Sequence, residues 1–261
     1  MKKVVLGVMF LLTGLQIFGA SDSNLTGQDI MKQVDKRNDG DTQISNLKMI
    51  LINKADEQRI RKVKSKRKDY GQDSKMLMTF VEPADVKGTG YLAWEFDNPE
   101  KDDSRWLYMP ALRKIRRISG SSNADYFMGT DFTYDDMGDR NVNEDNHKLL
   151  GEDNINGQIC WQIESIPKDK DDEYTKRVLW VRQDIDMVVK VKYFNEYGLL
   201  KTLKVSDIEK INGIWVAQKM VMDNKQDEHK TELYFQNVKI DIPIPDNLFR
   251  PTTLKRGSIR Y

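Results

Sequence analysis

Hydrophobic and polar positions alternate with a period of two along most of the chain, a pattern typical of β-strands. The first such runs cover residues 44–52, 76–81, 91–96 and 106–109, and a further short run covers 114–118. Several of these runs are apolar on both faces, as expected of strands with other structure packed on each side. The first half of the chain therefore predicts a series of largely buried strands.

The second half of the chain predicts a series of hairpins. The strand-like runs are 158–166, 177–182, 187–194, 199–211, 214–222 and 230–238. Asn156-Gly157 and Asn212-Gly213 favour two-residue turns, and residues 195–198 suit a longer turn. So many sequential antiparallel strands must close, curl or stack as two sheets. We expect a mainly β protein with few helices, built on a strongly curved antiparallel sheet, an incomplete β-barrel.

Two segments are available to fill the curve of that sheet. One is an N-terminal helix, in which Thr26 and Asp29 match a capping pattern, Ile30 begins a narrow apolar stripe and Gly40 provides a stop. The other is residues 126–134, where aromatic side chains mix with Gly and Asp and fit neither period. That composition suits a loop or short helical turn whose rings pack inward. We interpret it as a plug against the open side of the sheet.

The N-terminus has the three parts of a secretory signal peptide. A basic start precedes an apolar run at 4–18, and small residues precede cleavage after Ala20 or Ser21. A membrane anchor is the alternative, but the run is short for a bilayer and hydrophilic sequence follows at once. No cysteine lies near the cleavage site, so lipid attachment is not expected. We expect a signal peptide at 1–20 and a single periplasmic domain at 21–261.

Composition narrows the classes of function. The chain of 261 residues has a formal charge of +1, and a nearly neutral protein gives no reason to expect nucleic acid as a partner. The single Cys160 excludes an internal disulfide, and its strand-like surroundings favour a buried, inert thiol. The two histidines, His147 and His229, match no nucleophile or zinc pattern. We therefore expect no enzyme activity, no metal and no cofactor.

Acidic residues gather between positions 131 and 145. Their spacing does not match the twelve-residue calcium loop, which needs a glutamate at its end. We expect instead a loop that pairs with neighbouring arginines. The acidic residues are Asp131, Asp135, Asp136, Asp139, Glu144 and Asp145.

Residues 59–68 are the most highly charged segment. On a strand, the arginines at 59, 61 and 67 lie on one face and the lysines at 62, 64, 66 and 68 on the other. Such a segment is either a solvated edge strand whose charges discourage aggregation or a docking surface for anionic headgroups or an acidic partner. The residues assigned to docking are Arg59, Arg61, Lys62, Lys64, Lys66, Arg116 and Arg117.

An ordered set of short motifs extends over nearly all of the expected mature chain. It comprises Phe80-x-x-Pro83-x-Asp85, Gly88-Thr89, Leu92-x-Trp94, Trp106-x-Tyr108-x-Pro110, Arg116-Arg117, Gly129-Thr130-Asp131-Phe132, Leu179-Trp180-Val181, Gly198-Leu199-Leu200-Lys201 and Asn212-Gly213-Ile214-Trp215-Val216. In order and spacing, this set resembles the periplasmic outer-membrane lipoprotein-sorting proteins of the LolA/LolB-like superfamily.

The resemblance implies an incomplete β-barrel whose apolar cavity holds acyl chains. It implies a carrier that moves lipoproteins or other lipids between membranes without covalent chemistry. It also implies an inner-membrane exporter of the resistance-nodulation-division (RND) type as a partner. We further expect peripheral contact with anionic membrane surfaces and a monomeric protein. The chain is longer than the best-studied carriers, which leaves the cargo open.

Aromatic and methionine-rich strands are the candidate cavity wall, although the same positions suit a plain core. Flexible thioethers favour a surface that accepts varied apolar ligands. We assign the cavity to Met76, Met78, Phe80, Leu92, Trp94, Phe96, Trp106 and Tyr108, and a lid to Tyr126, Phe127, Met128 and Phe132. Two other functions stay open: a non-transporting module that docks on an envelope exporter, and a hydrolase of envelope lipids that uses aspartates of the plug.

Overall fold

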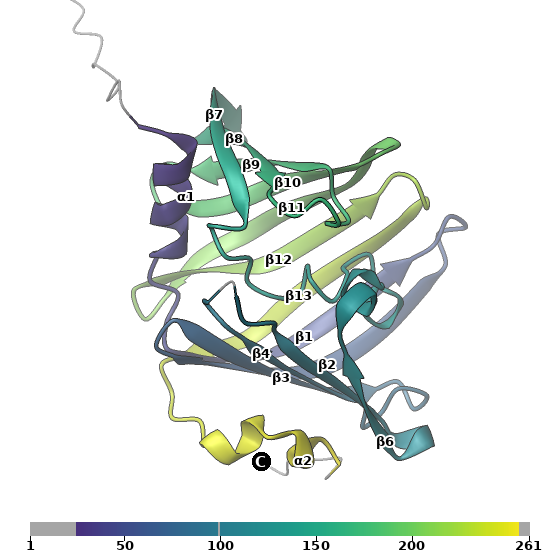
Figure 1. Cartoon of the computed structure of the whole chain (residues 1–261). Coiled ribbons are helices and arrows are strands. Elements are labelled where there is room, and N and C mark those ends of the chain that lie inside the picture. The colour runs from purple at the N-terminus through teal and green to yellow at the C-terminus, as the bar shows by residue number, and fades with distance from the viewer. Residues whose placement is uncertain (1–24, 99, 256–261) are drawn as a thin grey trace, which may run out of the picture.

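The computed structural model describes residues 25–98 and 100–255, so the expected signal peptide lies outside the described residues. In the described part, thirteen strands form one antiparallel sheet that curves strongly and does not close (Figure 1). The strands are β1 (Thr42–Ile52), β2 (Gln58–Tyr70), β3 (Asp73–Glu82), β4 (Gly90–Glu95), β5 (Ser104–Met109), β6 (Lys114–Ile118), β7 (Asp145–Ile155), β8 (Gln158–Pro167), β9 (Lys176–Arg182), β10 (Met187–Asn195), β11 (Gly198–Ile211), β12 (Ile214–Asn224) and β13 (His229–Ile240).

The order of strands explains the incomplete barrel. The first six strands follow one another to the edge β6, the last seven follow one another from the edge β7, and β1 pairs with β13 in the middle. In that central pair, Leu47 lies opposite Phe235. Edges β6 and β7 do not pair with each other. The expected fold class is confirmed.

Most sequence-based strand assignments agree with the structure, and two differ. The turn between Asn195 and Gly198 is a tight two-residue turn rather than a longer one. Strand β7 was not expected, because it is largely polar, and one of its faces is exposed from Asn146 to Asn154 while the other is only partly buried. It joins the sheet because ten of its residues pair with residues of β8, the next strand in the chain.

The N-terminal helix α1 (Gly27–Asp35) has the expected cap. The Asp29 amide donates to Thr26 Oγ1 at 3.1 Å, and the Asp29 carboxylate accepts from the Thr26 amide in return. Ile30 is fully buried against Ile163 and Val181. The helix ends at Asp35, before the expected stop at Gly40, whose positive φ of 88° instead makes the turn into β1.

An irregular segment, residues 119–144, fills the concave side of the sheet between β6 and β7 (Figure 1). This segment includes the expected plug at 126–134, and from here on we call all of 119–144 the plug. We call the face of the sheet that it covers the inner face. It contains the 3₁₀ turns η2 (Gly120–Ala124) and η3 (Phe127–Gly129). Phe127, Phe132 and Tyr134 are buried in the main core, so the expected inward packing is confirmed for these three rings, whereas Tyr126 is exposed.

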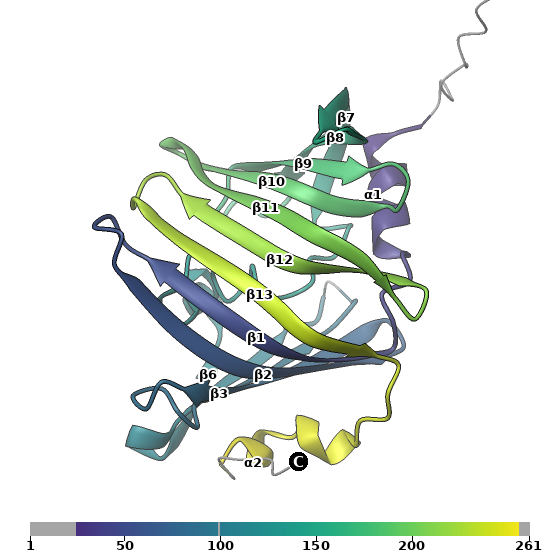
Figure 2. The ribbon, with the colours of Figure 1, turned by 180° about the vertical axis from the view of Figure 1, so that it is seen from behind.

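The last described residues, 241–255, form a C-terminal segment that lies on the opposite, outer face of the sheet (Figure 2). It contains η4 (Asp246–Phe249) and α2 (Pro251–Leu254). Its side chains Leu248, Phe249 and Leu254 pack against Leu77 and Leu92. The sheet therefore has a core on each face, which explains the strands that are apolar on both sides.

Candidate functional site

The inner face carries a continuous apolar surface that crosses the middle of the sheet. It combines fully or nearly fully buried side chains from β1, β2, β3, β12 and β13 with half-buried methionines at its margin. The buried members at its centre are Leu47, Met49, Val63, Phe80, Met222 and Leu233. The half-buried methionines packed against it include Met31, Met76, Met109, Met128, Met137 and Met220. Phe127, Phe132 and Tyr134 of the plug pack against this surface.

Aromatic rings hold the centre of the plug against that surface. The Phe127 ring lies 5.0 Å from Tyr91, 5.5 Å from Tyr134 and 6.2 Å from Phe80, measured between ring centroids. Phe127 is completely buried. The pairs with Tyr91 and Tyr134 are edge-to-face, an arrangement that stabilises the contact beyond simple burial. The Tyr126 ring lies farther out, and its hydroxyl donates to Asp227 Oδ2 at 3.0 Å.

Basic side chains of the sheet reach inward and bond to the plug from several strands. Lys201 Nζ on β11 lies 2.6 Å from Asp136 Oδ2, and His229 Nδ1 on β13 lies 2.7 Å from Asp131 Oδ2. Arg105 Nη1 on β5 lies 2.8 Å from Asp135 Oδ1. The Arg61 guanidinium on β2 donates to the plug carbonyl of Met128. The plug is therefore attached through individual side chains at separated points.

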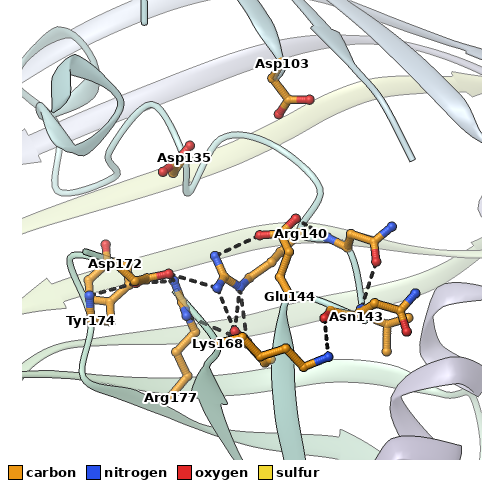
Figure 3. A network of polar contacts seen from close by, with 12 residues as sticks. Asp103, Asp135, Arg140, Asn143, Glu144, Lys168, Asp172, Tyr174 and Arg177 are labelled. Carbon is orange, nitrogen blue, oxygen red and sulfur yellow. Dashed lines mark hydrogen bonds and ion pairs between the residues drawn. The ribbon is translucent and has the colours of Figure 1, made fainter. Parts of the chain in front are cut away.

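The end of the plug is held by a second polar network around Arg140 (Figure 3). The Arg140 guanidinium lies 2.6 Å from Asp145, 2.8 Å from Asp172 and 3.2 Å from Glu144. Arg177 on β9 bonds Asp172 from the other side at 3.2 Å. Asp139 is bonded to Arg67 at 3.2 Å. The expected pairing of acidic residues with arginines is therefore confirmed for Asp135, Asp139, Glu144 and Asp145. The other two acidic residues differ, because Asp131 pairs with His229 and Asp136 with Lys201.

Burial changes the protonation of two carboxyl groups near these networks. Burial, reinforced by Asp139 and Asp103, raises the pKa of Glu95 to about 8. Burial also raises the pKa of Glu173 to about 7, with Lys201 acting against the shift. Both groups carry a proton over part of the physiological pH range, because their surroundings disfavour the charged form. Among the described residues, no cluster of His, Cys, Asp or Glu could hold a metal ion.

The structure divides the eight proposed cavity residues between the two faces of the sheet. Met76, Met78 and Phe80 belong to the inner core. The other four clustered residues, Leu92, Trp94, Trp106 and Tyr108, face outward and pack with the C-terminal segment. Phe96 lies at the end of β4 beneath the ammonium of Lys101, 3.3 Å from its ring centroid. The prediction of a single wall made of all eight is therefore wrong. Met78 is paired with Tyr91 on the inner face, and Leu92, the next residue on that strand, points to the opposite face.

Side chains of the basic segment, residues 59–68 on β2, alternate between the inner and outer faces of the sheet, as the period of a strand predicts. Arg61 and Arg67 turn inward, where Arg67 bonds Asp39 at 2.9 Å. The lysines turn outward, and Lys62 pairs with Glu82 at 2.8 Å in solvent. Strand β2 has neighbours on both sides, so the interpretation as an edge strand is wrong. Of the proposed docking residues, Arg61 is occupied by the plug.

Two further proposed docking residues lie on a true edge of the sheet. Arg116 and Arg117 are exposed on β6, where they bond only weakly to serine hydroxyls. Cys160 is fully buried on the outer face beside Trp180, as expected of an inert thiol. No helix in the described ranges is long and apolar enough to cross a membrane.

The C-terminal segment and the pocket beneath it are the feature that sequence analysis missed. Between it and strands β1–β3 lies an outer pocket of about 410 Å³. The alternation Ile242-Pro243-Ile244-Pro245 followed by Leu248-Phe249 was the available signal, since this apolar pattern cannot continue a central strand.

Comparisons with known proteins identify relatives over nearly the whole chain. A DUF1329 family protein from Desulfovibrio piger is 32% identical, with a TM-score of 0.83 over 87% of this chain and 97% of that one. A domain from Vibrio parahaemolyticus, described as an outer membrane lipoprotein-sorting protein, is also 32% identical, with a TM-score of 0.83 over 88% and 98%.

A LolA superfamily protein from Nitrosomonas europaea shares the fold at 19% identity, with a TM-score of 0.68 over 88% of this chain and 99% of that one. The model of a family described as "Uncharacterized protein" matches residues 72–256. No curated protein sequence matches the chain. The chain therefore belongs to the family of the DUF1329 and outer-membrane lipoprotein-sorting proteins, and it has the fold of the LolA superfamily.

Proposed function

We propose that the protein is a periplasmic carrier that binds acyl chains of lipoproteins or other lipids on the inner face of its sheet and moves them between envelope membranes. The observation that supports this proposal most is the apolar surface of the inner face, which the plug covers. Met78, Phe80 and Met222 line this surface, and flexible methionines lie at its margin. The plug covers this surface through individual side-chain bonds and ring packing. Under the proposal, Tyr126, Phe127, Met128 and Phe132 form a lid that gives way to the cargo.

The energetics allow such a lid to work reversibly. Burying ten methylenes of an acyl chain is worth about 8 kcal/mol before costs. Displacing the plug exposes rings and charged groups and reduces this gain, so we expect affinity in the micromolar range. A carrier of that affinity can load and unload, and its partners then determine the direction of transfer. The proposal involves no catalytic step and no cofactor.

The cellular setting belongs to the same proposal. We infer that residues 1–20 are removed as a signal peptide and that 21–261 act as one monomeric domain in the periplasm. The motifs and the likeness to a lipoprotein-sorting domain support this setting. Outward lysines of β2 would give peripheral contact with anionic lipid. An inner-membrane RND-type exporter remains the proposed partner.

The alternative function is a module that docks on an envelope exporter and carries no lipid. The buried Lys201–Asp136 pair and the fully buried Phe127 favour it, because both belong to a filled interior. In that case the plug would be a permanent part of the core. The two functions differ in whether an acyl chain ever reaches the inner face.

Titration with a fluorescent fatty acid distinguishes the two functions. Met220 and Val221 are half-buried neighbours on β12, of which Met220 borders the inner core and Val221 points to the other face. We expect micromolar binding to the wild type, at least a few-fold weaker binding to Met220→Gln, and unchanged binding to Val221→Gln. Absence of binding to the wild type would favour the docking module.

A further inference from the structure

The outer pocket is separated from the plug by the thickness of the sheet. Its floor is formed by outward side chains of β1 and β3, including Ile44, Leu77 and Thr79, and its roof by Ile244 and Leu248 of the C-terminal segment. Its volume of about 410 Å³ falls in the range of small-ligand pockets. Apolar groups dominate both floor and roof, which suits a hydrocarbon chain.

The roof of the pocket is fixed in place at one side. Lys68 Nζ donates to the carbonyl of Ile244 at 3.1 Å and lies 2.7 Å from Asp246 Oδ1. The Tyr70 hydroxyl donates to the same carboxylate at 2.9 Å. Pro243 and Pro245 stiffen the backbone between these bonds. The pocket is therefore formed in advance and does not require the ligand to order the segment.

Positive charge surrounds the apolar interior. Lys64, Lys66 and Lys87 line the pocket, and Lys64 and Lys87 are exposed side chains. Neighbouring Lys62 and Lys68 are paired with Glu82 and Asp246, whereas the ion pairs found among the described residues include neither Lys64 nor Lys87. Burial and the charge of Lys64 lower the pKa of Lys66. The site therefore has an excess of positive charge that an anion would offset.

We propose that this outer pocket binds a single-chain anionic amphiphile, such as a long-chain fatty acid. Its chain lies between Leu77 and Leu248, and its headgroup meets the ammonium groups of Lys64 and Lys87. This site is distinct from the inner face and does not depend on movement of the plug. It gives the chain a second lipid site on the opposite surface of the sheet, beyond the function proposed above.

A photoreactive fatty acid tests the site directly. After irradiation of the full mature protein with a diazirine-bearing palmitate, we expect labelled peptides from β3 and from residues 241–250. Thr79→Trp places a large side chain in the pocket and should abolish this labelling while leaving any inner-face label. In the double variant Lys64→Gln with Lys87→Gln, labelling of the outer peptides should require about tenfold more palmitate. The uncharged methyl ester should show the same loss with the wild type.

A matched control uses lysines elsewhere on the outer face. Lys48 and Lys219 lie over the Tyr234 ring, outside the pocket, so Lys48→Gln with Lys219→Gln should leave affinity unchanged. Labelling confined to inner-face peptides, or equal labelling of the outer peptides by acid and ester, would overturn the outer site and leave the carrier proposal standing. Labelling confined to the outer peptides would support the outer site and count against the inner one. Should Thr79→Trp fail to fold, the lysine variants decide.

Discussion

Lys201 on β11 and Asp136 in the plug form a buried ion pair, with Nζ 2.6 Å from Oδ2 and side chains that are 0% and 4% exposed. Lys201 also donates to the carbonyl of Asp131 at 3.0 Å. The Tyr174 hydroxyl donates to the Asp136 carboxylate at 3.0 Å. Removing either charge leaves the other in a place without water, so this pair links the stability of the sheet to the position of the plug.

We predict that Asp136→Asn lowers the free energy of unfolding by about 3 kcal/mol, because it leaves the ammonium of Lys201 buried and unpaired. Lys201→Met should cost less, since Asp136 keeps bonds from the Tyr174 hydroxyl and the Thr133 amide. Urea unfolding followed by circular dichroism measures both.

The exposed pair Lys62–Glu82 is a matched control for the buried pair, with side chains 56% and 59% exposed. Lys62→Met should change stability by less than about 1 kcal/mol. If Asp136→Asn were as mild as this control, the plug would not depend on its buried charges.

The outward lysines of β2 give a second prediction. Replacing Lys62, Lys64 and Lys66 by Gln should weaken binding to anionic vesicles by about 1 kcal/mol per residue, and the loss should shrink as salt rises. Thr79→Trp keeps these charges and should bind vesicles like the wild type. Unchanged vesicle binding by a folded triple variant would argue against peripheral contact between this face and anionic lipid.

Glu95 predicts a pH dependence of stability. Its pKa is about 8 in the folded protein against an ordinary 4.5, so the folded state holds this proton more tightly than the unfolded chain. The contribution of Glu95 to the free energy of unfolding is therefore complete below about pH 4.5 and is lost as the pH rises through about 8. Glu95→Gln keeps a neutral side chain beside Ser74.

We expect the melting temperature of Glu95→Gln to match that of the wild type near pH 5 and to exceed it increasingly towards pH 9. Thermal unfolding at several pH values provides the measurement. An advantage of the variant that shrinks with rising pH would mean that Glu95 is charged in the folded protein.

Tyr126 offers a mild way to loosen the proposed lid. Its hydroxyl bonds Asp227 at 3.0 Å and Asn224 at 2.9 Å, and the residue is 38% exposed. Tyr126→Phe should speed both uptake and release of an acyl probe several-fold while costing only about 1 kcal/mol of stability. Stopped-flow fluorescence measures the rates, and Tyr197→Phe, at an 80% exposed turn position, serves as control. Identical rates in both variants would argue against lid movement.

Phe127 could not serve this purpose, although the sequence marks it as a lid residue. Its complete burial between Phe80, Tyr91 and Tyr134 means that Phe127→Ala would cost about 3–5 kcal/mol. A loss of that size would obscure any change in rate. Sequence analysis placed its ring inward correctly but had no measure of how tightly it packs.

Local patterns predicted the fold well because strand period and turn chemistry act over short distances. The Thr26–Asp29 cap, strand β6 at Lys114–Ile118 and the outward lysines of β2 all follow from neighbouring residues. The strands that are apolar on both faces were recognised, but which face met the plug was not. That choice depends on where distant segments fold back.

The site was predicted less well for the same physical reason. Trp94 looked like a cavity wall, yet its indole Nε1 donates to the Phe249 carbonyl at 2.9 Å on the outer face. Lys201 gave no sign of being buried, because its partner Asp136 lies 65 positions away in the sequence. Such pairs emerge only from tertiary structure.

Native mass spectrometry of protein released from the periplasm without detergent tests the carrier proposal most directly. It should include the Thr79→Trp variant, in which the outer pocket is filled, so that any retained lipid is assigned to the inner face. We predict a mature chain with bound acyl lipid in both wild type and variant, and loss of that lipid when Met220→Gln is combined with Thr79→Trp. A wild-type protein that carries no lipid, and takes up none when offered, would contradict the carrier account.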